Sequence, residues 1–108
     1  MPVSRLERLL QFLEEDPNDA FTLFALAQEY TKLGDPTQAT ALYERLVNEQ
    51  PEYVGTYYHL GKIYEEADRF DEAVEIYQRG IVAATQAGDL HAKSELQSAL
   101  MDAQIGGL

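Results

Sequence analysis

Apolar residues recur at steps of three and four positions along most of this chain, which is the spacing of one face of an α-helix. One such series consists of Leu23, Leu26, Ala27, Tyr30 and Leu33, and the next of Ala39, Leu42, Tyr43, Leu46 and Val47. Gly34, Asp35 and Pro36 separate the two series. Glycine suits the left-handed residue after a helix, aspartate suits an N-cap and proline suits the first helical position. The pattern therefore predicts two helices joined by a tight turn.

The same arrangement returns 34 residues later, so that residues 17–50 align with residues 51–84. The residues identical in both copies are Pro17/Pro51, Thr22/Thr56, Leu26/Leu60, Tyr30/Tyr64, Ala39/Ala73, Tyr43/Tyr77 and Arg45/Arg79. The charged and polar positions mostly differ, so we interpret the shared residues as a packing code. The second copy turns at Asp68 and Arg69 without a glycine.

Small side chains at four aligned positions have a steric purpose in this pattern. Ala27 or Gly61 on the first helix of each copy is expected to meet Ala39 or Ala73 on the second. Small residues at such a contact let two helices approach closely, while the aligned tyrosines fill the flanking space.

Two helix pairs alone would leave an apolar face open at each end, so the flanking segments are expected to be caps. The N-terminal segment has start signals at Pro2 and Ser4, an apolar stripe of Leu6, Leu9, Leu10 and Leu13, and a stop at Asp16 and Pro17. The C-terminal segment follows a turn at Gly88 and Asp89 and carries Leu90, Leu96, Ala99, Leu100 and Ala103. The pattern thus predicts one all-α domain over residues 1–108, with helices at about 3–15, 19–33, 37–50, 53–67, 70–87 and 89–105.

The repeat resembles the tetratricopeptide repeat, whose period is 34 residues and whose pattern is W-x2-L-G-x2-Y, then A-x3-F, then P. The second copy reads Tyr57-x2-Leu60-Gly61-x2-Tyr64 and then Ala73-x3-Tyr77, and the first reads Leu23-x2-Leu26-Ala27-x2-Tyr30, then Ala39-x3-Tyr43, then Pro51. Departures are Leu23, Ala27, Gly80 and Thr85; because Thr85 replaces a closing proline, we expect the helix to continue to about Ala87.

The resemblance implies a right-handed superhelical stack of antiparallel helix pairs. Its parts would be an N-terminal capping helix, two repeats, and an extended helix end with a C-terminal capping helix, at residues 1–16, 17–50, 51–84 and 85–108. In such a stack the first helix of each pair lines a concave groove that binds peptides.

Carried over by position, the groove-facing residues are Phe21, Phe24, Gln28 and Thr31 from the first copy and Gly55, Tyr58, Lys62 and Glu65 from the second. Exposed aromatic side chains there would be anchors for a partner, unless the C-terminal helix covers them. A family subgroup grips the terminal carboxylate of chaperones with Lys and Asn side chains. The corresponding positions here are Phe24, Gln28 and His59, so we expect no binding of that kind.

The formal net charge of −11 argues against nucleic acid and anionic membrane surfaces as partners, because both need clustered Lys and Arg. The negative charge either keeps the protein soluble or attracts a basic partner. The sequence has no cysteine, no apolar run of membrane-spanning length and no signal-peptide pattern at its start. These features favour a cytoplasmic protein.

No pattern in the sequence indicates catalysis, a metal or a cofactor. His59 and His91 are the two histidines, and neither belongs to an H-E-x-x-H motif. Adjacent acids such as Glu65 and Glu66 point about 100° apart on a helix and do not converge on one substrate. There is no glycine-rich phosphate loop. We therefore expect a non-enzyme without cofactor or metal.

Two functional hypotheses remain open. The first is a protein-interaction adaptor or scaffold whose groove holds a peptide or helix from another protein, for which the net charge favours a basic one. The second is a self-associating scaffold that dimerises through its terminal helices, with Val3, Leu6, Leu10 and Phe12 partly exposed for pairing.

Overall fold

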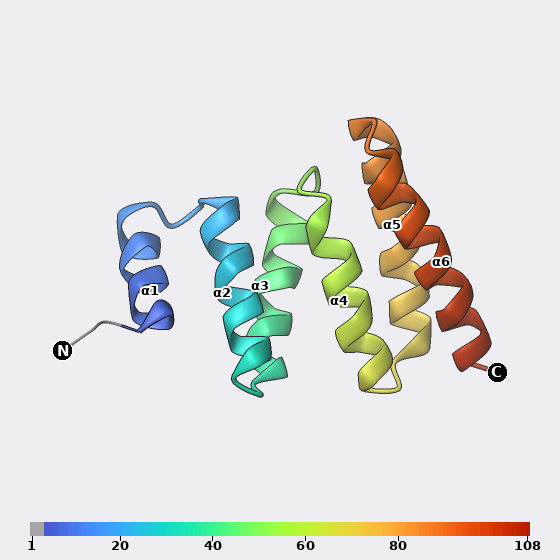
Figure 1. Cartoon of the computed structure of the whole chain (residues 1–108), viewed down its shortest axis with the longest axis horizontal. Helices are drawn as coiled ribbons and strands as arrows, with labels where there is room; N and C mark the ends of the chain where they lie inside the picture. The colour runs from blue at the N-terminus through green and yellow to red at the C-terminus, as the bar shows by residue number, and fades with distance from the viewer. Residues whose placement is uncertain (1–3) are drawn as a thin grey trace. The chain divides into compact units, whose positions relative to one another are not determined.

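The computed structural model describes residues 4–108, which contain six α-helices and no β-strand (Figure 1). The helices are α1 (Arg5–Glu15), α2 (Ala20–Lys32), α3 (Pro36–Glu49), α4 (Gly55–Glu66), α5 (Phe70–Ala87) and α6 (Leu90–Gly106). Their ends differ from the predicted ends by at most two residues. The predicted start at residue 3, with Pro2 as a start signal, lies outside the described residues.

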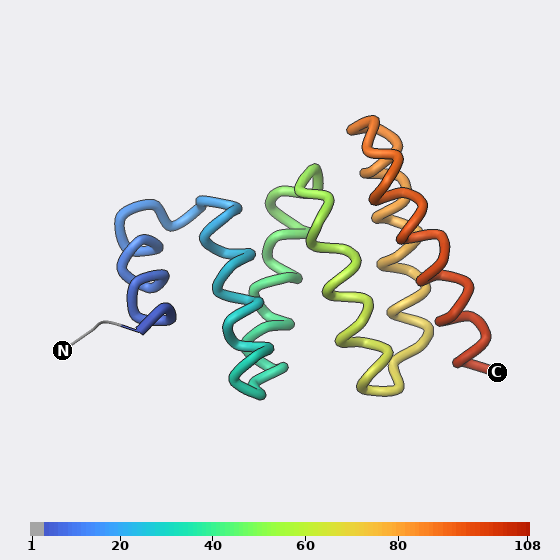
Figure 2. The backbone as a smooth tube through the Cα atoms, in the orientation of Figure 1, coloured from blue at the N-terminus to red at the C-terminus, as the bar shows by residue number. Residues whose placement is uncertain are grey.

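The chain divides between Gln50 and Pro51 into two compact units. The first contains α1, α2 and α3, and the second contains α4, α5 and α6. Figure 2 shows the backbone reversing direction at each tight turn within a unit, between α2 and α3, between α4 and α5, and between α5 and α6. Each repeat is therefore an antiparallel helix pair, as its sequence predicts.

Aspartate and serine side chains define most of the helix starts. Ser4, Asp19, Asp35 and Asp89 each accept a hydrogen bond from the backbone N–H three residues later. These bonds satisfy N–H groups that have no partner inside the helix. The predicted caps at Ser4, Asp35 and Asp89 are thereby confirmed.

The turn of each repeat passes through one residue of left-handed backbone. In the first repeat this residue is Gly34, with φ of 77°, and in the second it is Asp68, with φ of 59°. Asp68 bears the steric cost of about 1 kcal/mol that glycine avoids, although Asp tolerates this region better than most residues. Gly88, with φ of 70°, ends α5 in the same way.

In the first unit, α1 covers the outer side of the first repeat. Leu9 forms a buried cluster with Ala25 and Leu26, and the half-buried residues packed against it are Leu6, Leu13, Tyr30 and Leu42. The predicted stripe is therefore an intramolecular cap for Leu6, Leu9 and Leu13. Leu10, also predicted in that stripe, is instead 40% exposed.

The close approach of α4 and α5 in the second unit depends on glycine. A Cβ at Gly61 would overlap the ring of Tyr77, and a Cβ at Gly80 would lie 2.6 Å from the Cβ of Tyr57. Leu60 and Ala73 are almost fully buried beside them. The small residue at position 61 thus makes room for the ring of Tyr77, whereas the sequence predicts Ala73 as its neighbour.

Aligned proline carbonyls find different partners in the two repeats. The Nη2 of Arg45 donates to the carbonyl of Pro17 at 2.7 Å, whereas the hydroxyl of Tyr57 donates to the carbonyl of Pro51 at 2.5 Å. Both bonds tie an inter-helix loop to a neighbouring helix.

α5 is the longest helix of the described chain, with 18 residues, and it ends at Ala87 as the missing proline at position 85 predicts. α6 packs on α5 through Leu96, Ala99 and Ala103, which are buried at steps of three and four. The expectation that Leu90 belongs to this apolar face is wrong, since its side chain is 77% exposed. Leu90 lies six residues before Leu96, so the helical rotation turns it away from the buried face.

Gly61→Ala is expected to lower the free energy of unfolding by about 1–3 kcal/mol, because the added methyl group overlaps the buried ring of Tyr77. Gly55→Ala is the matched control, since Gly55 is exposed in the first turn of the same helix. That change should leave stability unchanged or raise it slightly through helix propensity. Urea unfolding followed by circular dichroism measures both; equal stabilities would contradict the close contact.

Two buried tyrosines make stability sensitive to alkaline pH. Burial raises the pKa of Tyr43 from 10.0 to about 12. A side-chain hydrogen bond with Thr31 acts in the opposite direction and lowers the pKa, but its effect is smaller. Burial is also the main cause of the raised pKa of Tyr77, and the hydrogen bond and charge of Glu65 add to it. A raised folded-state pKa gives stability that is complete below the unfolded value and is lost as pH rises toward the folded one.

We expect the Tyr43 hydroxyl alone to cost the fold about 1 kcal/mol of stability between pH 8 and pH 11. Tyr43→Phe should therefore show a smaller loss over that interval than the wild type. Urea midpoints at the two pH values provide the measurement. An equal loss in both proteins would mean that Tyr43 ionises as freely in the folded state as in the unfolded chain.

Candidate peptide-binding surfaces

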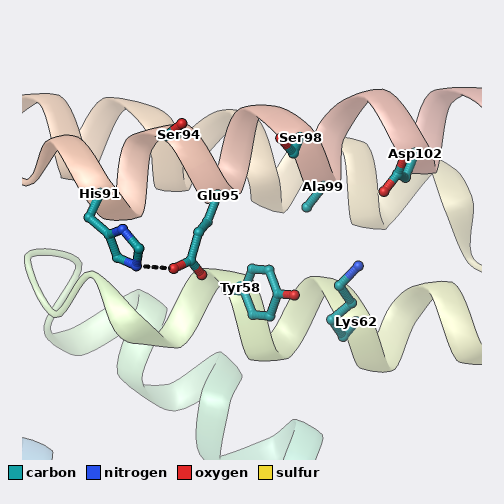
Figure 3. A pocket seen from close by; sticks show the side chains of 8 residues that line it. All are labelled: Tyr58, Lys62, His91, Ser94, Glu95, Ser98, Ala99 and Asp102. Carbon is teal, nitrogen blue, oxygen red and sulfur yellow. Dashed lines mark ion pairs between the residues drawn. The ribbon is translucent and has the colours of Figure 1, made fainter.

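A hollow of about 290 Å³ lies between α4 and α6 in the second unit (Figure 3). We call it the polar notch, and its lining residues are Tyr58, Lys62, His91, Ser94, Glu95, Ser98, Ala99 and Asp102. Two of the sequence-predicted site residues, Tyr58 and Lys62, therefore lie in a concave surface. The other residues all come from α6.

The helical spacing on each side explains why these side chains meet. Tyr58 and Lys62 are four residues apart on α4, so they share one face. Four of the five polar lining residues of α6 follow at steps of four, three and four: His91, Glu95, Ser98 and Asp102. This face of α6 lies beside the buried apolar face and is directed at α4. The C-terminal helix thus forms one wall of the notch, and Tyr58 remains half-buried and accessible.

The sequence reasoning missed the residues of α6. The 34-residue repeat ends at residue 84, and the pattern of the last helix predicts a cap rather than a wall of the site. The polar residues of α6 at helical spacing nevertheless indicate a second wall of the notch. A polar stripe beside an apolar stripe marks a helix face that lies at the edge of a packing contact.

Three predicted site residues form one connected cluster on α4. The Nζ of Lys62 lies 5.3 Å from the centroid of the Tyr58 ring and 3.4 Å from Oε2 of Glu65. The same Oε2 accepts a hydrogen bond of 2.5 Å from the hydroxyl of Tyr77. Glu65 is therefore held between a surface lysine and a core tyrosine, and its carboxylate holds Lys62 in place beside Tyr58.

Negative charge predominates around the notch. Glu95 and Asp102 line it, and Glu65 adjoins it through Lys62. Three carboxylates and one ammonium group give a local charge of −3 + 1 = −2 when the histidines are neutral. His91 pairs with Glu95 and adds positive charge only when it is protonated (Figure 3).

His59 lies next to the notch without lining it. Its ring makes an edge contact with Tyr58, with centroids 5.8 Å apart. Burial lowers the pKa of His59, and the charge of Glu95 opposes that shift. His59 is therefore held in its neutral form at neutral pH.

The predicted site residues of the first copy lie along one face of α2 in the first unit. Phe21 is 66% exposed, whereas Phe24 is half-buried and its ring makes an edge contact with Tyr43, with centroids 5.8 Å apart. Gln28 is half-buried, and the exposed Thr31 donates its hydroxyl hydrogen to the carbonyl of Ala27 at 2.9 Å. Phe21 is thus the accessible aromatic residue of this face, and Phe24 is partly engaged in packing. Gly55, at the start of α4, is exposed and does not line the polar notch.

Within residues 4–108, no group of three or more His, Asp or Glu residues is arranged to hold a metal ion. In the same residues no helix is long and apolar enough to span a membrane.

The sequence of this chain is similar to one family model and to a curated protein. Residues 4–80 match the family model described as "Anaphase-promoting complex, cyclosome, subunit 3", which is more than two thirds of the chain. A curated relative, a TPR repeat-containing protein of Pseudomonas aeruginosa, is 28% identical over 91 residues, which cover 84% of this chain and 87% of the relative.

Solved structures are similar as well. A tetratricopeptide repeat domain protein from Salinibacter ruber is 51% identical in its solution structure, with a TM-score of 0.78, covering 82% of this chain and 89% of that one. Its crystal structure is 50% identical, with a TM-score of 0.78, covering 80% and 97%. A protein from Bordetella parapertussis shares the fold at 22% identity, with a TM-score of 0.79, covering 95% and 90%.

Members of the family to which these relatives belong are generally non-catalytic modules for protein–protein interaction. The repeat spacing, the helix pairs with glycine–tyrosine contacts and these matches agree: the chain belongs to the tetratricopeptide repeat family.

Proposed function

We propose that this chain is an interaction module that binds a basic peptide segment of another protein in the polar notch between α4 and α6. The observation that carries the proposal is the combination of one accessible aromatic ring, Tyr58, with the carboxylates of Glu95 and Asp102 in one hollow. A Lys or Arg side chain of the partner would lie between these carboxylates, with its apolar stem against the ring.

The charges of the site favour a cationic guest over an anionic one. The Nζ of Lys62 already lies 3.4 Å from the carboxylate of Glu65, so a cationic guest would meet the carboxylate of Asp102 and compete with His91 for Glu95. The charge of −11 on the whole chain would raise the local concentration of a basic partner and speed its association. An acidic peptide would be repelled by the same field.

The exposed face of α2 is proposed as a second contact surface. Phe21 is the accessible side chain there, and large exposed aromatic residues are the anchors that most often dominate binding energy. Gln28 and Thr31 would add hydrogen bonds beside it. Phe24 would contribute less, because its ring is partly used by the contact with Tyr43.

An array of seven-residue peptides tests the charge preference of the notch. The peptides form matched sets that differ only in carrying Lys or Arg, Gln, or Glu at central positions. We expect the labelled protein to bind the basic set, to bind the Gln set more weakly, and to lose most binding when salt is raised, since the pairing is electrostatic. Equal binding of the Glu set would contradict the proposal.

Charge reversal locates the binding. The double variant Glu95→Lys/Asp102→Lys should weaken binding of the best basic peptide by about tenfold or more in isothermal titration calorimetry. The control Glu14→Lys/Glu75→Lys makes the same change in net charge at exposed residues that do not line the notch. It should keep most of the affinity. If both variants lose affinity equally, the peptide responds to net charge alone and the notch is not the site.

A further inference from the structure

The outer face of α6 carries an uncharged stripe of exposed residues. We call it the α6 seam; its members on the helix are Leu90, Ser94, Gln97, Met101 and Gln104, and it continues to Leu108, two residues after the end of α6. The five helical members follow at steps of four, three, four and three, which is the spacing of a helix face that packs lengthwise on another helix, and Leu108 comes four residues later. The seam shares only Ser94 with the polar notch.

Apolar surface is concentrated on this part of the molecule. Within residues 4–108, nine large apolar side chains are exposed, and four of them lie on α6 or directly after it: Leu90, Met101, Ile105 and Leu108. By contrast, α1 exposes Leu10 and Phe12, which are two residues apart and so point to different sides of the helix. The seam therefore offers a continuous face, and α1 does not.

We propose that the α6 seam pairs with the α6 seam of a second copy of this chain, with the two helices antiparallel. Such a pair has a two-fold axis, which we place at the level of residue 99 along the length of each helix. Leu90 then faces Leu108 of the other copy, Ser94 faces Gln104, and Gln97 faces Met101. Apolar residues meet at both ends, and the polar side chains between them can form hydrogen bonds across the axis.

The charge of the chain selects this face for self-association. Each copy carries −11, so two copies repel each other over most of their surfaces. The six seam positions contain no Asp or Glu, although the chain has nineteen acidic residues. An interface at the seam therefore brings no Asp or Glu side chains face to face. Most other surfaces of the chain would bring such like charges together, which disfavours them as interfaces between two copies.

The size of the seam predicts a reversible dimer. Its helical part, from Leu90 to Gln104, spans about 21 Å at the helical rise of 1.5 Å per residue. A single helix pair of that length buries less than a standard interface of about 1,600 Å², and such small interfaces are typical of weak association.

Analytical ultracentrifugation over a range of about 1 to about 500 µM measures the dimer. We expect the mass to rise with concentration from the monomer value of 12.2 kDa toward twice that value. Met101→Glu should keep the protein monomeric, because each copy would then bury a carboxylate in the seam. Phe12→Glu adds the same charge on α1 and should leave the dimer intact.

A charge pair across the axis separates seam contact from a general effect of charge. In Met101→Glu/Gln97→Lys, each new lysine faces the glutamate of the other copy, so the dimer should return. In Met101→Glu/Gln104→Lys the net charge is the same, but position 104 faces position 94, so the protein should stay monomeric.

Engineered thiols report the orientation, since the chain has no cysteine of its own. A mixture of Gln97→Cys and Met101→Cys chains should form a mixed disulfide faster than either chain alone. A wild type that is monomeric at every concentration would overturn the proposal. So would a dimer unaffected by Met101→Glu, or Met101→Cys chains that pair fastest with themselves.

Discussion

The contact of Gly61 with the ring of Tyr77 is the constraint on which the second unit depends. Because position 61 has no Cβ, the tyrosine ring can lie against the backbone of α4 and remain fully buried. Its hydroxyl then reaches Glu65, which in turn holds Lys62 beside Tyr58. One steric choice in the core therefore fixes the positions of three surface groups at the polar notch.

The helices and their ends follow from the sequence because they are set by local chemistry. The apolar spacing assigns each buried face, and aspartate or glycine at the ends supplies the N-cap or the left-handed residue. Even the turn without glycine was recognisable, since Asp68 is one of the few residues that tolerate the backbone conformation required. The α4 part of the notch was also predictable, because Tyr58 and Lys62 occupy positions that the repeat pattern assigns to the groove.

The α6 wall could not be found by counting repeats. α5 continues to Ala87, and this extension breaks the 34-residue period, so the position 34 residues after Tyr58 is the half-buried Ala92 rather than a notch residue. Nor do identical residues at aligned positions of the two repeats always form the same hydrogen bonds. Arg45 and Arg79 are aligned, yet Tyr57 is the residue that binds the proline carbonyl of the second repeat. Tertiary contacts, which the repeat pattern does not encode, decide these pairings.

Within each unit, the helices pack mainly on their neighbours along the chain: α1 on α2, α2 on α3, α4 on α5, and α5 on α6. Contacts between sequence neighbours close short loops and therefore cost little chain entropy before they become favourable. Helical proteins with such local topology typically fold in microseconds to milliseconds. In the same topology, contacts between neighbouring helices supply most of the stability of each helix pair. A helix pair at one end can therefore be gained or lost during evolution while the remaining pairs keep their own contacts.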